Sequence, residues 1–504
     1  MLWRRKKVEA GMPMSLGRML EESSREFPEH VALIQEGRRL TYTDLNKAVN
    51  SIGNKLRRAG LQKGDMVALL LPNCPEFVIS YFAIQKIGAV AVTLNVASTP
   101  YELRHLLGDS EAKGLIATTS LANKFEEIKN DLPLCKYLLL HNEQQPDNSP
   151  FLSALEAGPF TLEMPELQSG DPAVIIYTSG LTGKPVGAVL THHNLLTQSD
   201  LLKVICGTND KDRGLSLIPL FHSFGAVVNM LCAIRVGAGA VLMDHFSIDS
   251  IFSAIEKERI TYIAGVPRLF IGMVMQAEGK KFDLSSLDLC ISGGAAMPPE
   301  FFARFEEKFG VKIMEGYGLT EASPVCSFTR PFMAHKPGSV GTVVTGVEAR
   351  VVDDDDRELP TGVVGELIIR GENVMKGYYH DEAATAKVIR NGWLYTGDLA
   401  RIDEDGYIFI TGLKKRLIIT SGFNVYPREV EIVLNMHPAV KESLALGKPD
   451  LIRGETVKAL IVKNPGAQVE EKDLIRHCRK YLSSYKVPRN IEFVENIKLP
   501  LPPS

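Results

Sequence analysis

Residues 177–187 read YTSGLTGKPVG and lie between two short apolar runs, AVII at residues 173–176 and AVL at residues 188–190. Such runs predict two strands, so the glycine-rich stretch is expected to be the loop that joins them. Its glycines allow a tight turn and a close approach of the backbone to a ligand. Its hydroxyl groups and one lysine are donors suited to phosphate. The stretch predicts a phosphate cradle between two strands, with a plain polar turn as the alternative.

The spacing within this stretch differs from that of a Walker phosphate loop. Two residues separate Gly180 from Gly183, where the Walker motif has four. Lys184 is followed by proline rather than by serine or threonine. The stretch is therefore not a Walker loop.

Outside this loop, apolar strands alternate with helices over most of the chain. Residues 15–60 predict a helix, a short strand and a second helix, with Thr43 as the N-cap of the second. This alternation predicts stacked βαβ units and a parallel sheet. Residues 141–170 are polar and contain proline, so they are expected to form a loop. The further expected strands lie at residues 66–71, 89–92, 114–117, 137–140, 215–219, 239–243, 262–265 and 287–292.

The pattern changes towards the C-terminus. Beyond residue 340, short strands follow one another without helices of comparable length, which predicts a small β-barrel-like sub-domain. A separate α+β unit is expected to follow, with helices at residues 427–435 and 470–483. We therefore expect an α/β fold with two domains. Residues 1–413 form the N-terminal domain, including the β sub-domain at about 340–413, and residues 414–504 form the C-terminal domain.

The composition is that of an ordinary globular protein. Of its 504 residues, 45% are hydrophobic and 23% charged, and the net charge of −3 gives no argument for a nucleic-acid partner. Seven scattered cysteines without metal-binding spacing indicate a reduced, cytoplasmic compartment. No run of about 18 apolar residues is present. The basic residues 1–7 are expected to be a frayed end, with weak peripheral contact to a membrane surface as the alternative.

Four further motifs follow one another along the chain. They read SGGAA at residues 292–296, EGYGLTE at 315–321, WLYTGD at 393–398 and SGFNVYP at 421–427. Each has an ordinary structural alternative, such as a helix cap, close helix–strand packing or a turn. Together with residues 177–187, in this order, they resemble the adenylate-forming acyl-CoA synthetases, a family that includes luciferases and peptide-synthetase adenylation domains. The resemblance covers about residues 15–500 and implies ATP, Mg²⁺ and CoA as cofactors.

The resemblance assigns the phosphate-facing and metal-facing residues. Thr320 matches a threonine that contacts phosphate, and Glu321 matches the glutamate that holds Mg²⁺. A carboxylate oxygen is the ligand that such a hard cation prefers. The positions of the phosphate loop that match the family are Thr178, Ser179, Gly180, Thr182, Gly183 and Lys184.

It also implies where the nucleotide and the acid bind. Asp398 would accept from the ribose hydroxyls, Tyr317 would lie against adenine, and His222 would stand near the reacting carboxylate, with a core histidine as the alternative. The remaining nucleotide-binding positions are Gly294, Ala295, Ala296, Glu315, Gly316 and Gly318. The expected lining of the acyl tunnel is Phe224, Gly225, Val266, Gly293, Gly316 and Gly318, which favours an apolar monocarboxylic acid.

The C-terminal domain is implied to act as a mobile lid. Ser421 and Gly422 match a loop that faces CoA, and Lys415 matches the hinge about which the domain rotates between two half-reactions. One site would thus serve adenylation and thioester formation in turn.

The departures from the family pattern concern phosphate handling. Leu181 replaces a hydroxyl residue, Val186 a lysine, Leu413 an arginine and Arg416 an acidic residue. The sequence ends at Ser504, just before the Gly-Lys pair of the family would come, so we expect a shortened or a divergent chain. Losing such a cation commonly costs roughly two to four powers of ten in rate. Impaired adenylation is therefore expected.

These observations predict an AMP-forming carboxylic acid–CoA ligase, for a medium- or long-chain fatty acid, with the acid, ATP and CoA as its partners. Two alternatives within enzymes stay open, an acyl-AMP ligase that serves a carrier protein and an aryl acid–CoA ligase. A catalytically weak protein that binds nucleotide or acyl groups is the alternative outside them. The sequence also leaves a homodimer open.

Overall fold

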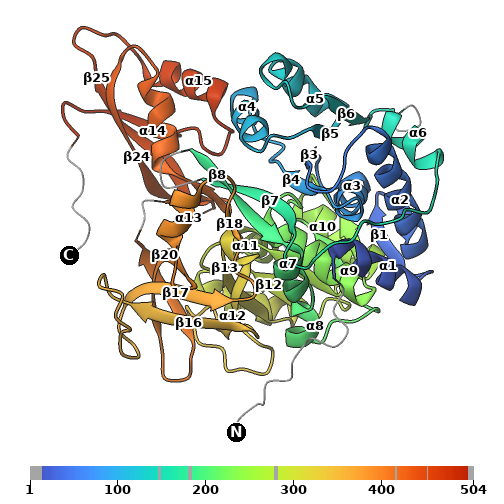
Figure 1. The fold of residues 1–504 in the computed structure, drawn as a ribbon. Coiled ribbons are helices and arrows are strands. Elements are labelled where there is room, and N and C mark those ends of the chain that lie inside the picture. Colours follow the sequence, from blue (N-terminus) through green and yellow to red (C-terminus); the bar gives the residue numbers. More distant parts are fainter. Residues whose placement is uncertain are drawn as a thin grey trace.

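The computed structural model describes residues 14–145, 149–179, 184–276, 282–414, 417–450 and 452–497. Within these residues the strands form four sheets (Figure 1). Two large sheets are mostly parallel, one smaller sheet is antiparallel, and the fourth belongs to the C-terminal unit. This arrangement confirms the predicted fold class.

The first large sheet holds the glycine-rich stretch at one side. Its strand order is β18-β8-β7-β4-β3-β5-β6. The strands from β7 to β6 are parallel to their neighbours, whereas β8 and β18 are added antiparallel. The bounds are β3 (Met66–Leu70), β4 (Val90–Thr93), β5 (Gly114–Thr118), β6 (Tyr137–His141), β7 (Pro172–Ser179), β8 (Pro185–Thr191) and β18 (Gly377–Tyr378).

The second large sheet has the order β15-β14-β13-β12-β11-β9-β10-β1-β2. It is parallel from β13 to β1 and ends in antiparallel strands on both sides. The bounds are β1 (Val31–Gln35), β2 (Arg38–Thr41), β9 (Arg213–Ser216), β10 (Gly239–Leu242), β11 (Tyr262–Gly265), β12 (Leu289–Ser292), β13 (Ile313–Gly318), β14 (Val325–Phe328) and β15 (Thr342–Val343).

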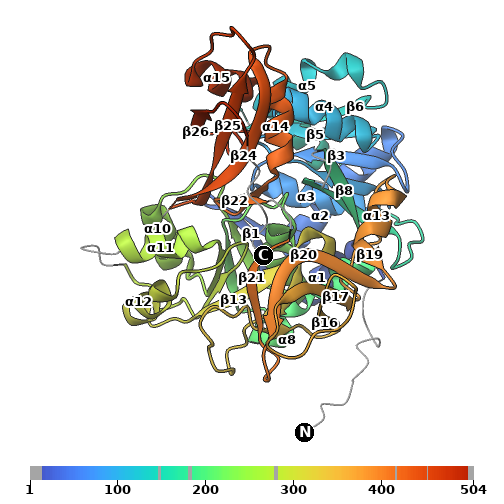
Figure 2. The same cartoon turned by 90° about the vertical axis from the view of Figure 1, so that its left-hand side faces the viewer.

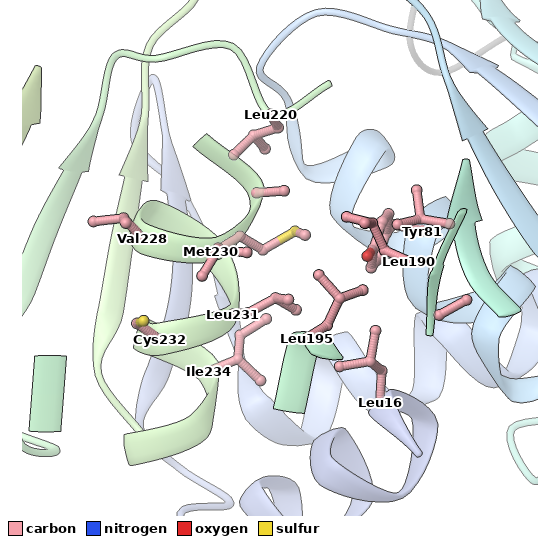
Figure 3. Close-up of a cluster of buried hydrophobic side chains, with 14 of the residues drawn as sticks. Leu16, Tyr81, Leu190, Leu195, Leu220, Val228, Met230, Leu231, Cys232 and Ile234 are labelled. Atoms are coloured by element: carbon pink, nitrogen blue, oxygen red, sulfur yellow. The ribbon is translucent and has the colours of Figure 1, made fainter. Parts of the chain in front are cut away.

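Helices fill the space between and around these sheets. Helix α3 is buried along its whole length, which explains its nearly continuous apolar sequence. The π-helical segment η3 packs near it in a large apolar cluster (Figure 3). The bounds are α1 (Leu16–Glu26), α2 (Tyr42–Arg58), α3 (Pro75–Lys86), α4 (Pro100–Asp109), α5 (Thr119–Glu126), η1 (Lys129–Asp131), α6 (Pro150–Glu156), α7 (His192–Ser199), α8 (Leu201–Cys206), η3 (Gly225–Leu231), α9 (Cys232–Val236), α10 (Ile248–Glu258), α11 (Pro267–Gln276), α12 (Pro299–Phe309) and η4 (Thr320–Ala322).

Two local predictions were wrong. Helix α2 begins after Thr41, not Thr43, because the Thr41 side chain accepts from the backbone N–H of Asp44 while the Asp44 side chain accepts from that of Thr41. This reciprocal capping box satisfies two N–H groups that the helix leaves free. Residues 141–170 are not entirely loop, since α6 lies within them.

The third sheet forms the predicted β sub-domain. Its strands are ordered β16-β17-β20-β19, and β21 pairs with the other part of β20. The bounds are β16 (Val347–Val352), β17 (Gly365–Gly371), α13 (Glu382–Val388), β19 (Ile389–Arg390), β20 (Trp393–Ile402) and β21 (Ile408–Leu413).

The C-terminal unit has its own apolar core beneath two helices, which lie at the same end of the molecule as α4 (Figure 2). Helix α14 coincides with the predicted residues 427–435. The bounds are β22 (Ile418–Thr420), β23 (Phe423–Val425), α14 (Pro427–Asn435), β24 (Val440–Asp450), β25 (Gly454–Lys463), α15 (Glu471–Tyr481) and β26 (Asn490–Phe493).

A buried ionic contact joins this unit to α4. Lys486 Nζ lies 2.8 Å from Glu102 Oε1 and 2.5 Å from Glu429 Oε1, and the Ser483 hydroxyl donates to Glu102 Oε2 at 2.6 Å. All four residues are buried. We call these four residues the seam. Thr99 also donates to the backbone carbonyl of Tyr481, at 2.9 Å.

No helix in the described part of the chain is long and apolar enough to cross a membrane. Each of the seven cysteines is unpaired.

Candidate functional site

A cavity of about 290 Å³ opens where the two large sheets, the β sub-domain and the C-terminal unit meet. Its walls come from the ends of β7, β12, β13 and β20, from the segment that precedes η3, and from the loop around β23. Ligands of open α/β sheets commonly bind at the carboxyl ends of parallel strands, which is where β12 and β13 reach it.

The cavity brings together most of the predicted site residues. They come from positions more than 200 residues apart in the sequence. The members that line it are Thr178, His222, Gly294, Ala295, Ala296, Glu315, Gly316, Tyr317, Gly318, Thr320, Glu321, Asp398 and Gly422.

The hydroxyl groups form one polar corner around Glu321. Thr178 Oγ1 donates to Glu321 Oε1 at 3.0 Å, and the Tyr378 hydroxyl donates to the same oxygen at 2.9 Å. Ser223 Oγ lies 3.2 Å from Thr320 Oγ1 in the buried part of this corner. No described residue forms a hydrogen bond or an ion pair with Glu321 Oε2. One carboxylate beside hydroxyl groups fits Mg²⁺, which is usually held by one or two carboxylates and by substrate phosphates.

A second pair lies on the opposite side. The Tyr317 hydroxyl donates to Asp398 Oδ2 in a short hydrogen bond. Burial raises the pKa of Tyr317 well above its usual value, and the adjacent Asp398 raises it further. The phenol is therefore a neutral donor at pH 7. This contact places Tyr317 beside Asp398, the residue of β20 that lines the cavity.

Glu315 is the unusual carboxyl group of the cavity. It is buried, and its Oε1 accepts from the backbone N–H of Met297 at 3.3 Å. Burial raises its pKa to about 7, against the opposing effect of that hydrogen bond. Glu315 therefore changes its charge near neutral pH, unlike an exposed glutamate.

His222 is neutral at pH 7, because burial lowers its pKa to about 4. Its Nδ1 accepts from the backbone N–H of Phe224 at 3.2 Å. A neutral imidazole that accepts at Nδ1 carries its hydrogen on Nε2. His222 can thus donate one hydrogen bond from Nε2, but it brings no positive charge.

Among the described residues, the carboxyl groups that line the cavity outnumber the lysines and arginines. Its carboxyl groups are Glu315, Glu321 and Asp398, whereas no lysine or arginine is among the described residues that line it. Lys184 is exposed and does not line the cavity. Leu413 does line it and is paired directly opposite Asp398 between β20 and β21. An apolar side chain therefore stands where the family resemblance predicts an arginine.

Several predicted positions lie elsewhere. Gly225 packs against the backbone of Pro219, where a Cβ would come within 2.3 Å of a carbonyl oxygen, so it does not line the tunnel. Val266 also lies outside the lining and instead packs against Gly422. Ser421 is beside the cavity, and its hydroxyl accepts from Arg268 at 3.5 Å.

Other predicted positions fall outside the described residues. They are Gly180, Leu181, Thr182, Gly183, Lys415 and Arg416, together with the side chain of Ser179.

Sequence reasoning missed three residues at this site. Tyr378 reaches Glu321 from a two-residue strand, and Asn424 and Tyr426 line the cavity from the C-terminal unit. The sequence KGYYH around Tyr378 carries no recognisable signal for this position. Asn424 and Tyr426 lie within the quoted SGFNVYP motif, where only Ser421 and Gly422 were assigned.

Comparison with known proteins gives consistent matches. The family model "AMP-binding enzyme" matches residues 20–379, and "AMP-binding enzyme C-terminal domain" matches residues 429–503. A long-chain-fatty-acid–CoA ligase of Bacillus subtilis is 35% identical over 508 residues, covering 95% of this chain and 91% of that protein.

Two solved structures are similar over nearly their full length. An o-succinylbenzoate CoA synthetase double mutant from Bacillus subtilis, bound with a product analogue, superposes with a TM-score of 0.86 at 28% identity and covers 95% of each chain. An anthranilate CoA ligase in complex with anthranoyl-AMP superposes with a TM-score of 0.77 at 30% identity and covers 98% of this chain and 95% of the other.

Proposed function

The chain belongs to the AMP-binding enzyme family and is an AMP-forming acyl-CoA synthetase, and from this premise we propose that its substrate is a medium- or long-chain fatty acid. The observation that carries the proposal is the lining of the cavity. Phe224, Val228, Ile291 and Phe328 offer apolar surface, and no described lysine or arginine lines the cavity to pair with a second carboxylate. The identity with the Bacillus subtilis long-chain ligase supports the same substrate class.

In the first half-reaction, an oxygen of the acid attacks the α-phosphorus of ATP while the bond to pyrophosphate breaks. The hydroxyl groups of Thr178 and Thr320 are placed to donate to phosphate oxygens, and His222 Nε2 to donate to the acid. Glu321 would hold Mg²⁺, which supplies positive charge at the phosphates when bound.

The nucleotide would be held by the opposite wall. Asp398 would exchange the Tyr317 hydroxyl for the ribose hydroxyls, and the ring of Tyr317 would lie against adenine. Glu315 would accept from the adenine amino group, since it lines the cavity together with Gly294 and the two alanines that follow it. Small side chains in that segment leave room for a base.

In the second half-reaction, the CoA thiolate attacks the acyl carbon and AMP leaves. The C-terminal unit would serve this step in the orientation of this structure, since Gly422, Asn424 and Tyr426 line the cavity. Support comes from the TM-score of 0.86 with the product-analogue complex, against 0.77 with the acyl-AMP complex at similar identity. We place the domain boundary at residues 413/414, after β21, with Lys415 as the hinge.

Adenylation is proposed to be the weaker half-reaction. Leu413 lines the cavity at the position where the family resemblance predicts an arginine, and attack on ATP gathers negative charge there. Thioester formation begins after pyrophosphate has left, so it has less charge to stabilise.

Two assays on the full chain test this function. Decanoic, palmitic and anthranilic acids are offered with ATP and CoA, and ATP–pyrophosphate exchange is compared with thioester formation from the corresponding synthetic acyl-AMP. We expect thioester from the fatty acyl-AMPs at least ten-fold faster than exchange. Equal rates would reject the weak adenylation, and turnover confined to anthranilic acid would establish the aryl acid ligase that the anthranilate relative favours.

A further inference from the structure

Tyr378 reaches the polar corner from the edge of the first large sheet. It belongs to β18, which pairs with β8, the second strand of the phosphate-loop hairpin. The flanking backbone is fixed on both sides, because Lys376 N donates to Val189 O at 2.9 Å and Tyr379 N donates to Gly187 O at 2.7 Å. Tyr378 N also donates to the Thr385 hydroxyl at 2.8 Å. The ring is therefore carried by a strand with little freedom to move.

The same segment holds Glu321 at two points. Met375 N donates to the backbone carbonyl of Glu321 at 2.8 Å, and the Tyr378 hydroxyl donates to its side-chain Oε1 at 2.9 Å. Thr178, on the first strand of the hairpin, donates to that same Oε1. Two donors on one oxygen fix the plane of the carboxylate and leave Oε2, to which no described residue donates, for another ligand.

The tyrosine is suited to this task. A phenol is neutral in the physiological range and can donate one hydrogen bond to a carboxylate. A phenylalanine would keep the ring and lose only the donor. Among the described residues, only Thr178 would then donate to the carboxylate of Glu321.

We infer that Tyr378 is a positioning residue that orients Glu321 towards the metal-bound phosphates, so that its hydroxyl sets the affinity of the site for Mg²⁺ with ATP. The inference rests on the proposed metal role of Glu321. The Tyr378 side chain thereby connects the carboxylate of Glu321 to β18, the strand that pairs with the phosphate-loop hairpin.

The experiment compares Tyr378→Phe with Tyr379→Phe, a neighbouring tyrosine without a bond to Glu321. Binding of Mn²⁺ to the full chain with ATP is followed by electron paramagnetic resonance, and adenylation is titrated with Mg²⁺. A hydrogen bond to a charged group is worth roughly a factor of ten or more. We expect Tyr378→Phe to weaken Mn²⁺ binding about ten-fold, and high Mg²⁺ to restore its rate. Tyr379→Phe should match the unmodified protein.

Glu321→Gln separates the inference from its premise. If Glu321→Gln weakens Mn²⁺ binding while Tyr378→Phe does not, the role of Tyr378 is overturned and the metal site stands. If Glu321→Gln binds Mn²⁺ with ATP like the unmodified protein, the proposed metal role fails and the inference fails with it. A loss of rate in Tyr378→Phe that excess Mg²⁺ does not restore would indicate a structural role and would also overturn the inference.

Discussion

The seam and the cavity both bury carboxyl groups, but they balance the charge differently. In the seam, Lys486 lies between Glu102 and Glu429. In the cavity, Glu315, Glu321 and Asp398 face a lining without a described lysine or arginine. The seam therefore contains its own cation, whereas no described lysine or arginine of the lining plays that part for Glu315 and Glu321 in the cavity.

The pKa values of the buried carboxyl groups differ between the seam and the cavity. Burial opposes ionisation of Glu102, yet Lys486 and Ser483 lower its pKa below the usual value. Burial also disfavours the charged lysine, but Tyr485, Glu429 and Glu102 raise the pKa of Lys486 above its usual value. Glu429 keeps a raised pKa through burial, and its Oε2 has no partner in the described part of the chain. In the cavity, burial raises the pKa of Glu315, and no lysine or arginine among the described lining residues opposes this effect.

The largest expected effect comes from breaking the seam. Lys486→Met removes the ammonium group that lies between two buried carboxylates, and removal of one partner of a buried pair typically costs about 3–5 kcal/mol. We expect the docking of the C-terminal unit to weaken by that order. Native-state hydrogen exchange of the amides in α14 and α15 measures it.

Lys480→Met is the matched control, since Lys480 lies on α15 and is exposed. It should leave the exchange rates near those of the unmodified protein. Equal protection in both variants would show that the seam contributes no net stability.

The second largest expected effect comes from Glu315 in the cavity. The pKa of Glu315 is about 7 in the folded chain and near 4.5 for the ordinary side chain. The folded state therefore binds more protons between these values, so the contribution of Glu315 to stability falls as pH rises from about 4.5 to about 7. The full difference is roughly 3 kcal/mol.

Glu315→Gln should remove this dependence. The unfolding midpoint at pH 8 minus that at pH 5 is measured for each protein. This difference should be larger for Glu315→Gln than for the unmodified protein. The exposed Glu348→Gln serves as the control. Parallel pH profiles for the unmodified protein and Glu315→Gln would contradict the burial argument.

The smallest expected effect tests whether the cavity lacks a cation for adenylation. Leu413→Arg places a guanidinium opposite Asp398, at the edge of the cavity. We expect ATP–pyrophosphate exchange to rise about ten-fold, equivalent to about 1.4 kcal/mol in the barrier. Leu413→Met keeps the apolar volume and should not change the rate. No gain from the arginine would mean that position 413 does not limit adenylation.

Sequence patterns predicted the fold class for a physical reason. The helix at residues 427–435 and the two paired strands that flank the glycine-rich stretch are local features, set by proline, glycine and apolar spacing. The placement of Thr178, Glu321 and Asp398 followed from family resemblance, and the cavity brings these three residues together.

What could not be predicted depends on contacts distant in sequence. Glu102 and Lys486 are 384 positions apart, and neither has a neighbouring residue that indicates its partner. Tyr378 lies on a strand of two residues, too short for any periodicity to reveal. Thr41 and Thr43 are equally good caps in isolation, and only the reciprocal bonds with Asp44 distinguish them.

Strand β18 also bears on how this protein can be divided. It pairs with β8 although its chain neighbours belong to the β sub-domain, so the polypeptide returns to its first sheet after leaving it (Figure 1). The match to the AMP-binding family model ends at residue 379, directly after this strand. A fragment that stopped at the end of the second large sheet would expose the edge of β8 as an unpaired template for aggregation. The β sub-domain and the first sheet thus belong to one module, and domain swaps among relatives should cut after β21, at residue 413, rather than before residue 340.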